Sequence, residues 1–227
     1  MRMEVSVLGK DGVFSRTALE WDACVAAGYT GRDQAGVLAH VEELRKIGVP
    51  APEKVPSMYW VEPDRVSQAD VLWVVGESTS GEAEVFLART AGGDLCVSVA
   101  SDHTDRALET VSVAKAKQAC SKIVGALFWK VDEVRDHWDS IELRSWVDGK
   151  LYQEGTLGRM LPPEKLFELA REDAPFVPCR LSLFSGTLPV LGDGIVFGKQ
   201  YVLSLKDPVL GREIRCMYSV RVLPDRN

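Results

Sequence analysis

The chain has 227 residues, of which 46% are hydrophobic and 26% are charged, and its formal net charge is −6. This length suits one large or two small domains with a sizeable core, and the composition is that of a soluble globular protein. Interspersed charges argue against a nucleic-acid groove, and no apolar run is long enough for a signal peptide or a membrane span. We expect neither nucleic-acid nor membrane partners.

The five cysteines are odd in number and show no C-x-x-C spacing. Three of them lie in strand-like apolar runs, where a free thiol behaves as a small buried hydrophobe: Cys96, Cys179 and Cys216. Neither the cysteines nor the three histidines have the spacing of zinc ligands. The pattern predicts a cytoplasmic protein without structural disulfides.

The first part of the chain predicts a hairpin and then a helix. Apolar residues in Val5–Leu8 and Arg16–Leu19 flank a turn-rich tetrapeptide, as in an antiparallel hairpin. Apolar residues then recur at helical spacing in Gln34–Ile47, directly after Asp33, which is a candidate helix cap. The helix is expected to end at Gly48, and because three prolines follow, Val49–Pro56 is expected to be extended and to serve as a hinge or linker.

The remainder of the chain is rich in strands. β-branched and aromatic residues predict strands at Val71–Val75, Glu82–Arg89, Leu95–Ala100, Ile141–Val147, Leu181–Phe184, Tyr201–Leu205 and Ile214–Val222. Asp148-Gly149 is a two-residue hairpin signal. Helices are predicted at Leu108–Ala119, Val131–His137 and Pro163–Arg171. Since strands outnumber helices and do not alternate regularly with them, we expect an α+β, mainly β protein built on a β-sandwich or β-roll.

Three acidic residues in two short segments form the first candidate site. Glu82 and Glu84 are two positions apart, so on a strand their carboxylates share one face. Adjacent carboxylates repel each other unless a cation or a proton lies between them. Asp102 could complete an oxygen cage for Mg²⁺ or Mn²⁺. The alternative is two solvent-facing glutamates and a turn aspartate.

A histidine and a glutamate on the first predicted helix form a second candidate. His40 and Glu43 are three positions apart and share one helix face. Glu43 could accept a hydrogen bond from the imidazole and raise its basicity, as the acid does in a catalytic dyad. The alternative is an ordinary pair of surface residues.

Further polar residues could complete a pocket. Arg106 could hold a substrate carboxylate with a bidentate fork, or could pair with Asp105 at the surface. Three lysines on or just past a helix are expected to be mostly solvated, although one near a metal could neutralise developing charge: Lys115, Lys117 and Lys122. Alternation along an extended chain directs His103 away from its neighbour Asp102.

Two turns also remain open to either interpretation. Gln153 follows the predicted hairpin, and Ser185-Gly186-Thr187 follows a predicted strand. Each could be an ordinary turn, and the second could instead present hydroxyl and N–H groups to a ligand. The sequence contains no Gly-rich phosphate loop and no G-x-S-x-G nucleophile elbow.

The order of these motifs resembles the fumarylacetoacetate hydrolase superfamily. Its members show an H-x-x-E dyad on a lid, a proline-containing stretch, E-x-E, D-x-T-x-R, a lysine, an N/D-G hairpin ending in Gln, and a G-T-P turn. Residues 28–205 offer in that order His40 to Glu43, Pro50 with Pro52 and Pro56, Glu82 to Glu84, Asp102 to Arg106, Lys117, Asp148-Gly149 with Gln153, and Gly186 to Pro189. Each motif is weak alone, but their common order is specific.

The resemblance implies a β-roll or distorted β-sandwich, often dimeric, with residues 1–56 as hairpin and helical lid and residues 57–227 as catalytic domain. It implies metal ligands for Mg²⁺ or Mn²⁺ at Glu82, Glu84 and Asp102. It implies a water-activating dyad of His40 and Glu43, a site lysine at Lys117 or alternatively Lys115, and substrate-binding residues Arg106, Gln153 and Thr187.

The implied activity is hydrolysis of a C–C or related acyl bond in a small oxo-acid or 1,3-dicarbonyl compound by a homodimer. A decarboxylase, isomerase or hydratase at the same site is one alternative, and a non-catalytic binding protein is another. The chain departs from the family pattern at Ala107, Glu109 and Leu188, and the stretch between Asp102 and Lys117 is short. These departures fall on the substrate side of the pocket rather than on the metal side.

Overall fold

The computed structural model describes residues 1–46 and 51–226, without the side chains of His40, Glu43, Leu44 and Lys46. The strands form a ten-stranded sheet and a five-stranded sheet, and a two-stranded ribbon joins β7 (Thr79–Ser80) to β10 (Thr104–Asp105). The architecture is the α+β, mainly β class predicted from the sequence.

The larger sheet contains a closed ring of strands. Its order is β4 (Ser57–Val61), β3 (Ala23–Gly28), β15 (Leu181–Phe184), β8 (Ala83–Thr90), β2 (Phe14–Glu20), β1 (Arg2–Leu8), β12 (Leu127–Lys130), β9 (Leu95–Ser101), β11 (Lys122–Val124) and β5 (Val66–Ser67). Because β8 also pairs with β9, the strands β8, β2, β1, β12 and β9 close on themselves. The hairpin of β1 and β2 is the one predicted, and its strands pair across the predicted domain boundary at residue 56.

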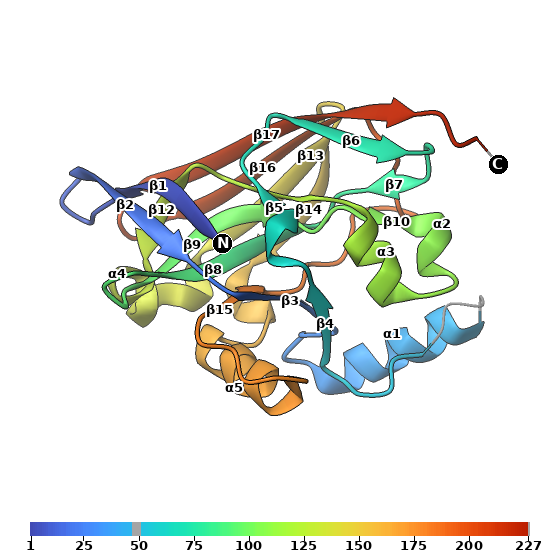
Figure 1. The fold of residues 1–227 in the computed structure, drawn as a ribbon, viewed down its shortest axis with the longest axis horizontal. Helices are drawn as coiled ribbons and strands as arrows, with labels where there is room; N and C mark the ends of the chain where they lie inside the picture. The colour runs from blue at the N-terminus through green and yellow to red at the C-terminus, as the bar shows by residue number, and fades with distance from the viewer. Residues whose placement is uncertain (47–50, 227) are drawn as a thin grey trace.

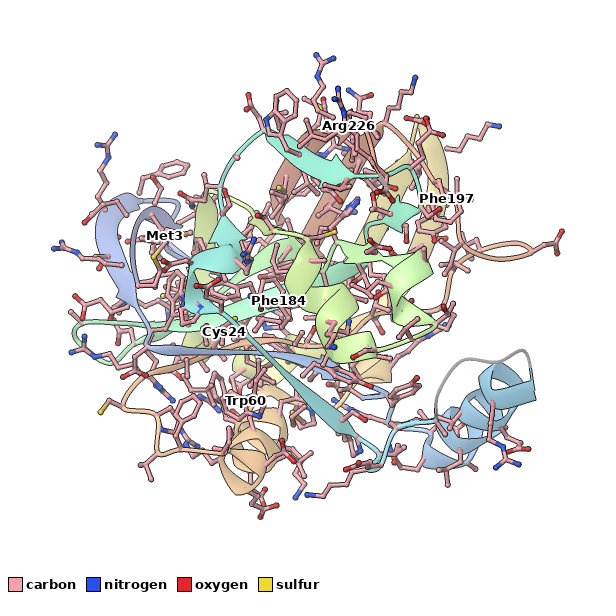
Figure 2. All side chains as sticks on the ribbon, turned by 45° about the vertical axis from the view of Figure 1, so that its right-hand side comes forward. Met3, Cys24, Trp60, Phe184, Phe197 and Arg226 are labelled. Carbon is pink, nitrogen blue, oxygen red and sulfur yellow. The ribbon has the colours of Figure 1, made fainter. Side chains whose placement is uncertain are left out.

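The ring encloses an apolar core. Phe86 lies at its centre, with its ring centroid 5.5 Å from that of Trp21 and 5.0 Å from that of Phe184. Figure 2 shows Phe184 and Cys24 in the interior and Arg226 at the periphery. Side chains alternate along a strand, so Glu84 lies on the same face of β8 as Phe86, toward the interior of the ring.

The smaller sheet covers the larger one. Its strands are β14 (Lys150–Thr156), β13 (Glu142–Val147), β16 (Gln200–Asp207), β17 (Arg212–Leu223) and β6 (Val71–Val75). Asp148 and Gly149 connect β13 to β14 with φ values of 48° and 79°, as the predicted two-residue hairpin requires. Alternate residues of β13 and β16, such as Leu143 and Leu203, are buried in the core between the two sheets.

The helices lie outside the sheets. They are α1 (Gln34–Lys46), α2 (Arg106–Glu109), α3 (Val113–Ala119), α4 (Val131–Val134) and α5 (Pro163–Asp173), with short 3₁₀ turns η1 (Pro63–Arg65), η2 (Arg135–Ser140) and η3 (Leu157–Arg159). In Figure 1, α1 and α5 lie below the larger sheet and the smaller sheet lies along the top. None of the helices in the described ranges is long and apolar enough to cross a bilayer.

Local contacts explain where the predicted helices need correction. Asp33 caps α1 as predicted, because its Oδ1 accepts a hydrogen bond from the Gly36 N–H at 3.1 Å. The prediction of one continuous helix over Leu108–Ala119 is wrong. The chain forms two helices there, because Ser112 has an extended backbone and is the N-cap of α3. The predicted burial of Cys179 is also wrong, since this cysteine is exposed and lies outside the strands.

Candidate functional site

The pairing of β8 with β9 assembles the predicted acidic triad. Ala83 is the partner of Ser101, and the Asp102 N–H donates to the carbonyl of Glu82 at 3.1 Å. Glu82 directly precedes β8, Glu84 is its second residue, and Asp102 directly follows β9. One carboxylate oxygen of each of the three residues lies within 4.8 Å of the others. The triad therefore sits at one end of the apolar ring interior.

Glu84 is a buried carboxyl group with no ion-pair partner among the described residues. Its side chain is 1% exposed, and its Oε2 accepts a hydrogen bond from the Gly186 N–H at 2.9 Å. Among the described residues, no lysine or arginine forms an ion pair with Glu84. Burial, reinforced by the charge of Asp102, raises the pKa of Glu84 well above its ordinary value. A cation at the triad would relieve this penalty.

Two buried lysines hold Asp102. Lys117 Nζ contacts Oδ2, and Lys122 Nζ lies 2.6 Å from Oδ1 and donates to the His103 carbonyl at 2.5 Å. Burial opposes ionisation of Asp102, but the charges of Lys117 and Lys122 outweigh it and hold the pKa of Asp102 well below its usual range. The expectation that Lys122 is solvated is wrong, because it lies on β11 and is fully buried.

The donor set fits a hard divalent cation. Asp102 Oδ1 is buried and makes no hydrogen bond of ordinary geometry, although Lys122 Nζ is close to it. A buried carboxylate oxygen with free lone pairs, beside a second buried carboxylate, is suited to coordinate a metal. Three carboxylates without sulfur or imidazole ligands favour Mg²⁺ or Mn²⁺.

Arg106 lies beside the triad and has a partner close to each of its three nitrogens, although Nη2 makes no hydrogen bond of ordinary geometry. Its Nη2 is 2.9 Å from a Glu82 oxygen, its Nη1 is 2.8 Å from a Glu109 oxygen, and its Nε donates to Ser80 Oγ at 2.7 Å. Burial opposes the charge of Arg106, but Glu82 and Glu109 outweigh it and raise its pKa. The guanidinium thus holds one carboxylate oxygen of Glu82.

Gln153 and Thr187 support the start of β8. Gln153 is buried; its Oε1 accepts from the Ala83 N–H and from Ser145 Oγ at 2.9 Å each, and its Nε2 donates to Thr187 Oγ1 at 2.7 Å. Thr187 Oγ1 in turn donates to the Ala83 carbonyl at 2.7 Å. Both residues therefore fix the backbone between the two glutamates.

The turn that carries Thr187 requires its glycine. Gly186 has φ +82°, and a Cβ there would lie 2.2 Å from Thr30 Oγ1. This close approach brings the Gly186 N–H to Glu84, as described above. The Ser185-Gly186-Thr187 turn thus presents an N–H group to a candidate metal ligand.

His103 points away from the triad, as predicted. Its Nδ1 lies 2.9 Å from the Tyr218 hydroxyl and its Nε2 lies 2.9 Å from Thr79 Oγ1. Burial, with Lys122 and Arg106 adding to it, lowers the pKa of His103 to about 3, so the ring is neutral. Its place is in the packing beneath the smaller sheet.

Two tyrosines near the site were not identified from the sequence. Tyr29 follows β3 and Tyr59 lies on β4, and both are half-buried. Lys117 Nζ lies 5.6 Å from the centroid of the Tyr59 ring. Burial raises the pKa of Tyr29 to about 12, and Tyr59, Glu109 and Glu82 add to the rise. Tyr29 has φ 58°, which is uncommon for a residue with a side chain and marks a constrained position.

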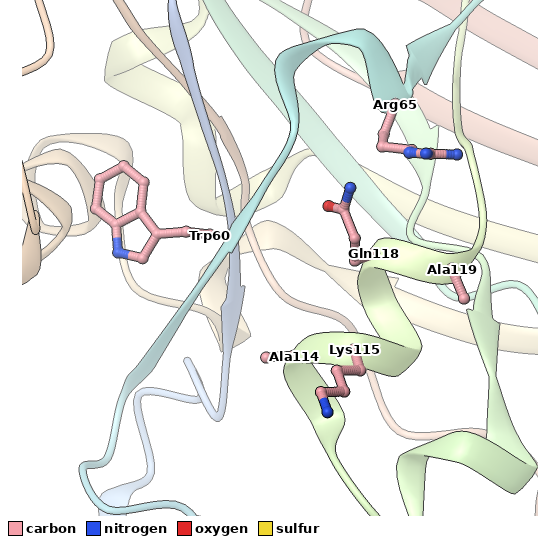
Figure 3. A pocket seen from close by; sticks show the side chains of 6 residues that line it. All are labelled: Trp60, Arg65, Ala114, Lys115, Gln118 and Ala119. Carbon is pink, nitrogen blue, oxygen red and sulfur yellow. The ribbon is translucent and has the colours of Figure 1, made fainter.

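The remaining candidates lie elsewhere. Lys115 lines a separate shallow depression between β4 and α3, with Trp60, Arg65, Ala114, Gln118 and Ala119 (Figure 3). Lys117, not Lys115, therefore reaches the triad. The side chains of His40 and Glu43 lie outside the described part of the structure, although both positions belong to α1. The proposed dyad stays a prediction.

Comparison with solved structures supports the fold. A 2-keto-3-deoxy-D-arabinonate dehydratase complexed with magnesium and 2,5-dioxopentanoate is 16% identical, with TM-score 0.61, over 93% of this chain and 77% of that chain. A 5-carboxymethyl-2-hydroxymuconate delta-isomerase from Mycobacterium smegmatis is also 16% identical, with TM-score 0.58, over 92% and 81%. A candidate fumarylacetoacetate isomerase/hydrolase from Oleispira antarctica is 19% identical, with TM-score 0.62, over 88% and 93%.

Sequence comparison identifies the family. No curated protein matches the chain. Residues 27–218 match the family described as protein of unknown function (DUF2848). Since this match extends over most of its length, the chain belongs to the DUF2848 family, and its fold is that of the fumarylacetoacetate hydrolase superfamily.

Proposed function

We propose that the protein is a divalent-metal-dependent enzyme that hydrolyses a C–C or related acyl bond in a small oxo-acid or 1,3-dicarbonyl compound. The observation that carries the proposal is the triad of Glu82, Glu84 and Asp102, in which Glu84 and Asp102 are buried and Glu84 has no ion-pair partner among the described residues. The magnesium and dioxo-acid bound to the dehydratase of the same fold support the substrate class.

The residues of the triad region have separate roles in this proposal. Glu82, Glu84 and Asp102 would hold Mg²⁺ or Mn²⁺, which when bound supplies a Lewis acid that polarises a substrate carbonyl. Burial opposes the charge of Lys117, but Asp102 outweighs it and raises the pKa of Lys117, so the ammonium persists. Lys117 would stabilise the negative charge that develops on the substrate.

A first test concerns metal binding. Adding Mg²⁺ or Mn²⁺ after EDTA treatment should raise the melting temperature, because an ion that binds only the folded state stabilises it by about 2.7 kcal/mol at a hundred times its Kd. Thermal melts with EDTA and with each ion measure the shift. An unchanged melt in every condition would favour the non-catalytic binding protein instead.

A second test concerns the predicted dyad on α1. If His40, oriented by Glu43, removes the proton from the attacking water, then His40→Ala should lower kcat on the order of 10²–10⁴-fold. The metal-induced melting shift should stay as in the wild type, since His40 is not among the proposed ligands. Unchanged turnover in this variant would remove the hydrolytic role of the dyad.

A second reaction class has a specific observation in its favour. Solved structures with this fold include a dehydratase and an isomerase. Such reactions use the same polarised carbonyl and do not require an attacking water. Turnover in ¹⁸O-labelled water separates the two classes, because hydrolysis leaves label in the new carboxylate.

We further propose a cytoplasmic homodimer. All five cysteines are free, which fits a reducing compartment. Trp73, Val75 and Met217 are exposed on β6 and β17, where a second copy could cover them. Light scattering of the purified chain measures the oligomeric state.

A further inference from the structure

We infer that the site accepts an oxo-acid with a single carboxylate and an uncharged far end, and that Glu109 excludes dicarboxylates. This inference rests on the proposed function and specifies its substrate class. The inference follows from the ion pairs that the charged side chains around the triad form with one another.

The first step is the balance of charge. Among the side chains that the structure describes, the ion pairs around the triad join four carboxylates to three cations: Glu82, Glu84, Asp102 and Glu109 to Lys117, Lys122 and Arg106. A bound divalent ion would change this excess of one negative charge into an excess of one positive charge. One substrate carboxylate would then neutralise the site, whereas a second would add an unmatched charge in a largely buried region.

The second step is that each of these three cations is paired with a carboxylate of the protein, so none of them is left for a second carboxylate of the substrate. Lys117 and Lys122 each lie on one oxygen of Asp102. Arg106 uses Nε and both terminal nitrogens on Ser80, Glu82 and Glu109. A bidentate contact with a substrate needs two free nitrogens on one edge of the guanidinium, and Glu109 holds Nη1 at 2.8 Å.

The third step is the character of the nearby wall. Tyr29 and Tyr59 are half-buried phenols, and the charges of Glu109 and Lys117 act on both of them. Their high pKa values keep both phenols neutral at physiological pH. Neutral hydroxyl groups beside a carboxylate favour a substrate end that is uncharged or donates hydrogen bonds, such as a hydroxyl or an amide.

Calorimetric titration of the Mg²⁺-loaded protein with two acids of similar length tests this. We expect 2-oxohexanoate, which has one carboxylate, to bind at least about tenfold more tightly than 2-oxoglutarate, which has two. In Glu109→Gln, the negative charge that pairs with Arg106 is removed, so 2-oxoglutarate should bind at least about tenfold more tightly than it does to the wild type. The affinity for 2-oxohexanoate should change little.

Two further variants serve as controls. Glu168→Gln removes an exposed glutamate that also forms an (i, i+3) ion pair, with Lys165 at 3.0 Å, and should leave both affinities unchanged. Glu109→Asp keeps the charge and should keep the preference for one carboxylate. It also keeps the test open if Glu109→Gln does not fold.

The outcomes separate the inference from the proposed function. Equal binding of the two acids by the wild type would overturn the inference alone, and so would a Glu109→Gln variant that folds but leaves their ratio unchanged. If the protein binds Mg²⁺ but neither acid, the oxo-acid class itself is overturned, and the inference with it.

Discussion

Replacing Glu84 by glutamine should abolish the metal-induced stabilisation and should also make the metal-free protein more stable. Glu84 is buried, has no ion-pair partner among the described residues, and has a pKa raised above the ordinary value of 4.5. A raised pKa means that Glu84 favours folding at pH values below 4.5 and that this contribution is lost as the pH rises through its folded-state pKa. At pH 8 in EDTA, glutamine should therefore raise the free energy of unfolding by about 0.5–2 kcal/mol.

The metal-bound state should respond in the opposite direction. Glutamine offers a neutral amide in place of a carboxylate, so the stabilisation by Mg²⁺ should disappear in urea unfolding. Glu154→Gln is the control, because Glu154 is exposed on β14 and pairs with Arg144 at 2.7 Å. A Glu84→Gln protein that keeps the full Mg²⁺ effect would remove Glu84 from the ligand set.

Asp102→Asn should be the most destabilising single substitution in the site. It leaves the ammonium groups of Lys117 and Lys122 buried without their counter-charge, and breaking a buried ion pair in this way costs about 3–5 kcal/mol. Because the pKa of Asp102 is lowered, its contribution is complete above the ordinary pKa of about 3.9 and is lost only as the pH falls through the folded-state value. Urea unfolding at pH 7 measures the full effect.

A surface pair and a double mutant make this test specific. Asp94→Asn breaks the exposed pair with Lys130, 2.7 Å long, and should cost no more than about 1 kcal/mol. Adding Lys122→Gln to Asp102→Asn should recover part of the loss, because it removes one of the two unmatched charges. If Asp102→Asn is no more destabilising than Asp94→Asn, the two lysines are not held as the structure indicates.

The sequence predicts many of the strands and the shared face of Glu82 and Glu84, because these depend on local periodicity. The predicted strands at Val71–Val75 and Leu181–Phe184 match the structure in both bounds. The alternation that put Glu82 and Glu84 on one face also holds, since the antiparallel pairing of β8 with β9 brings Asp102 to both. A pattern of period two is sufficient to predict the strands and the shared face of the two glutamates, whereas the resemblance to a known family assigned Asp102 to the same site.

Other features depend on contacts distant in sequence. Ala23–Gly28 consists of small residues without a strand signal, and it becomes β3 because it pairs with β15 and β4. Lys122 lies in a strand of only three residues, and its burial depends on its contact with Asp102. Nothing in the local sequence of Tyr29 signals its positive φ, which the structure around it imposes.

The closed ring also ties the site to the register of its strands. Glu84 and Phe86 share one face of β8, while Ala83, Val85 and Leu87 pack on the other. Sliding β8 by one residue against β9 would exchange these faces, sending Phe86 out of the ring and Glu84 away from Asp102. A single-residue insertion or deletion within β8 would therefore disrupt the core and the triad together. Changes of length are tolerable only in the loops outside the strands of the ring.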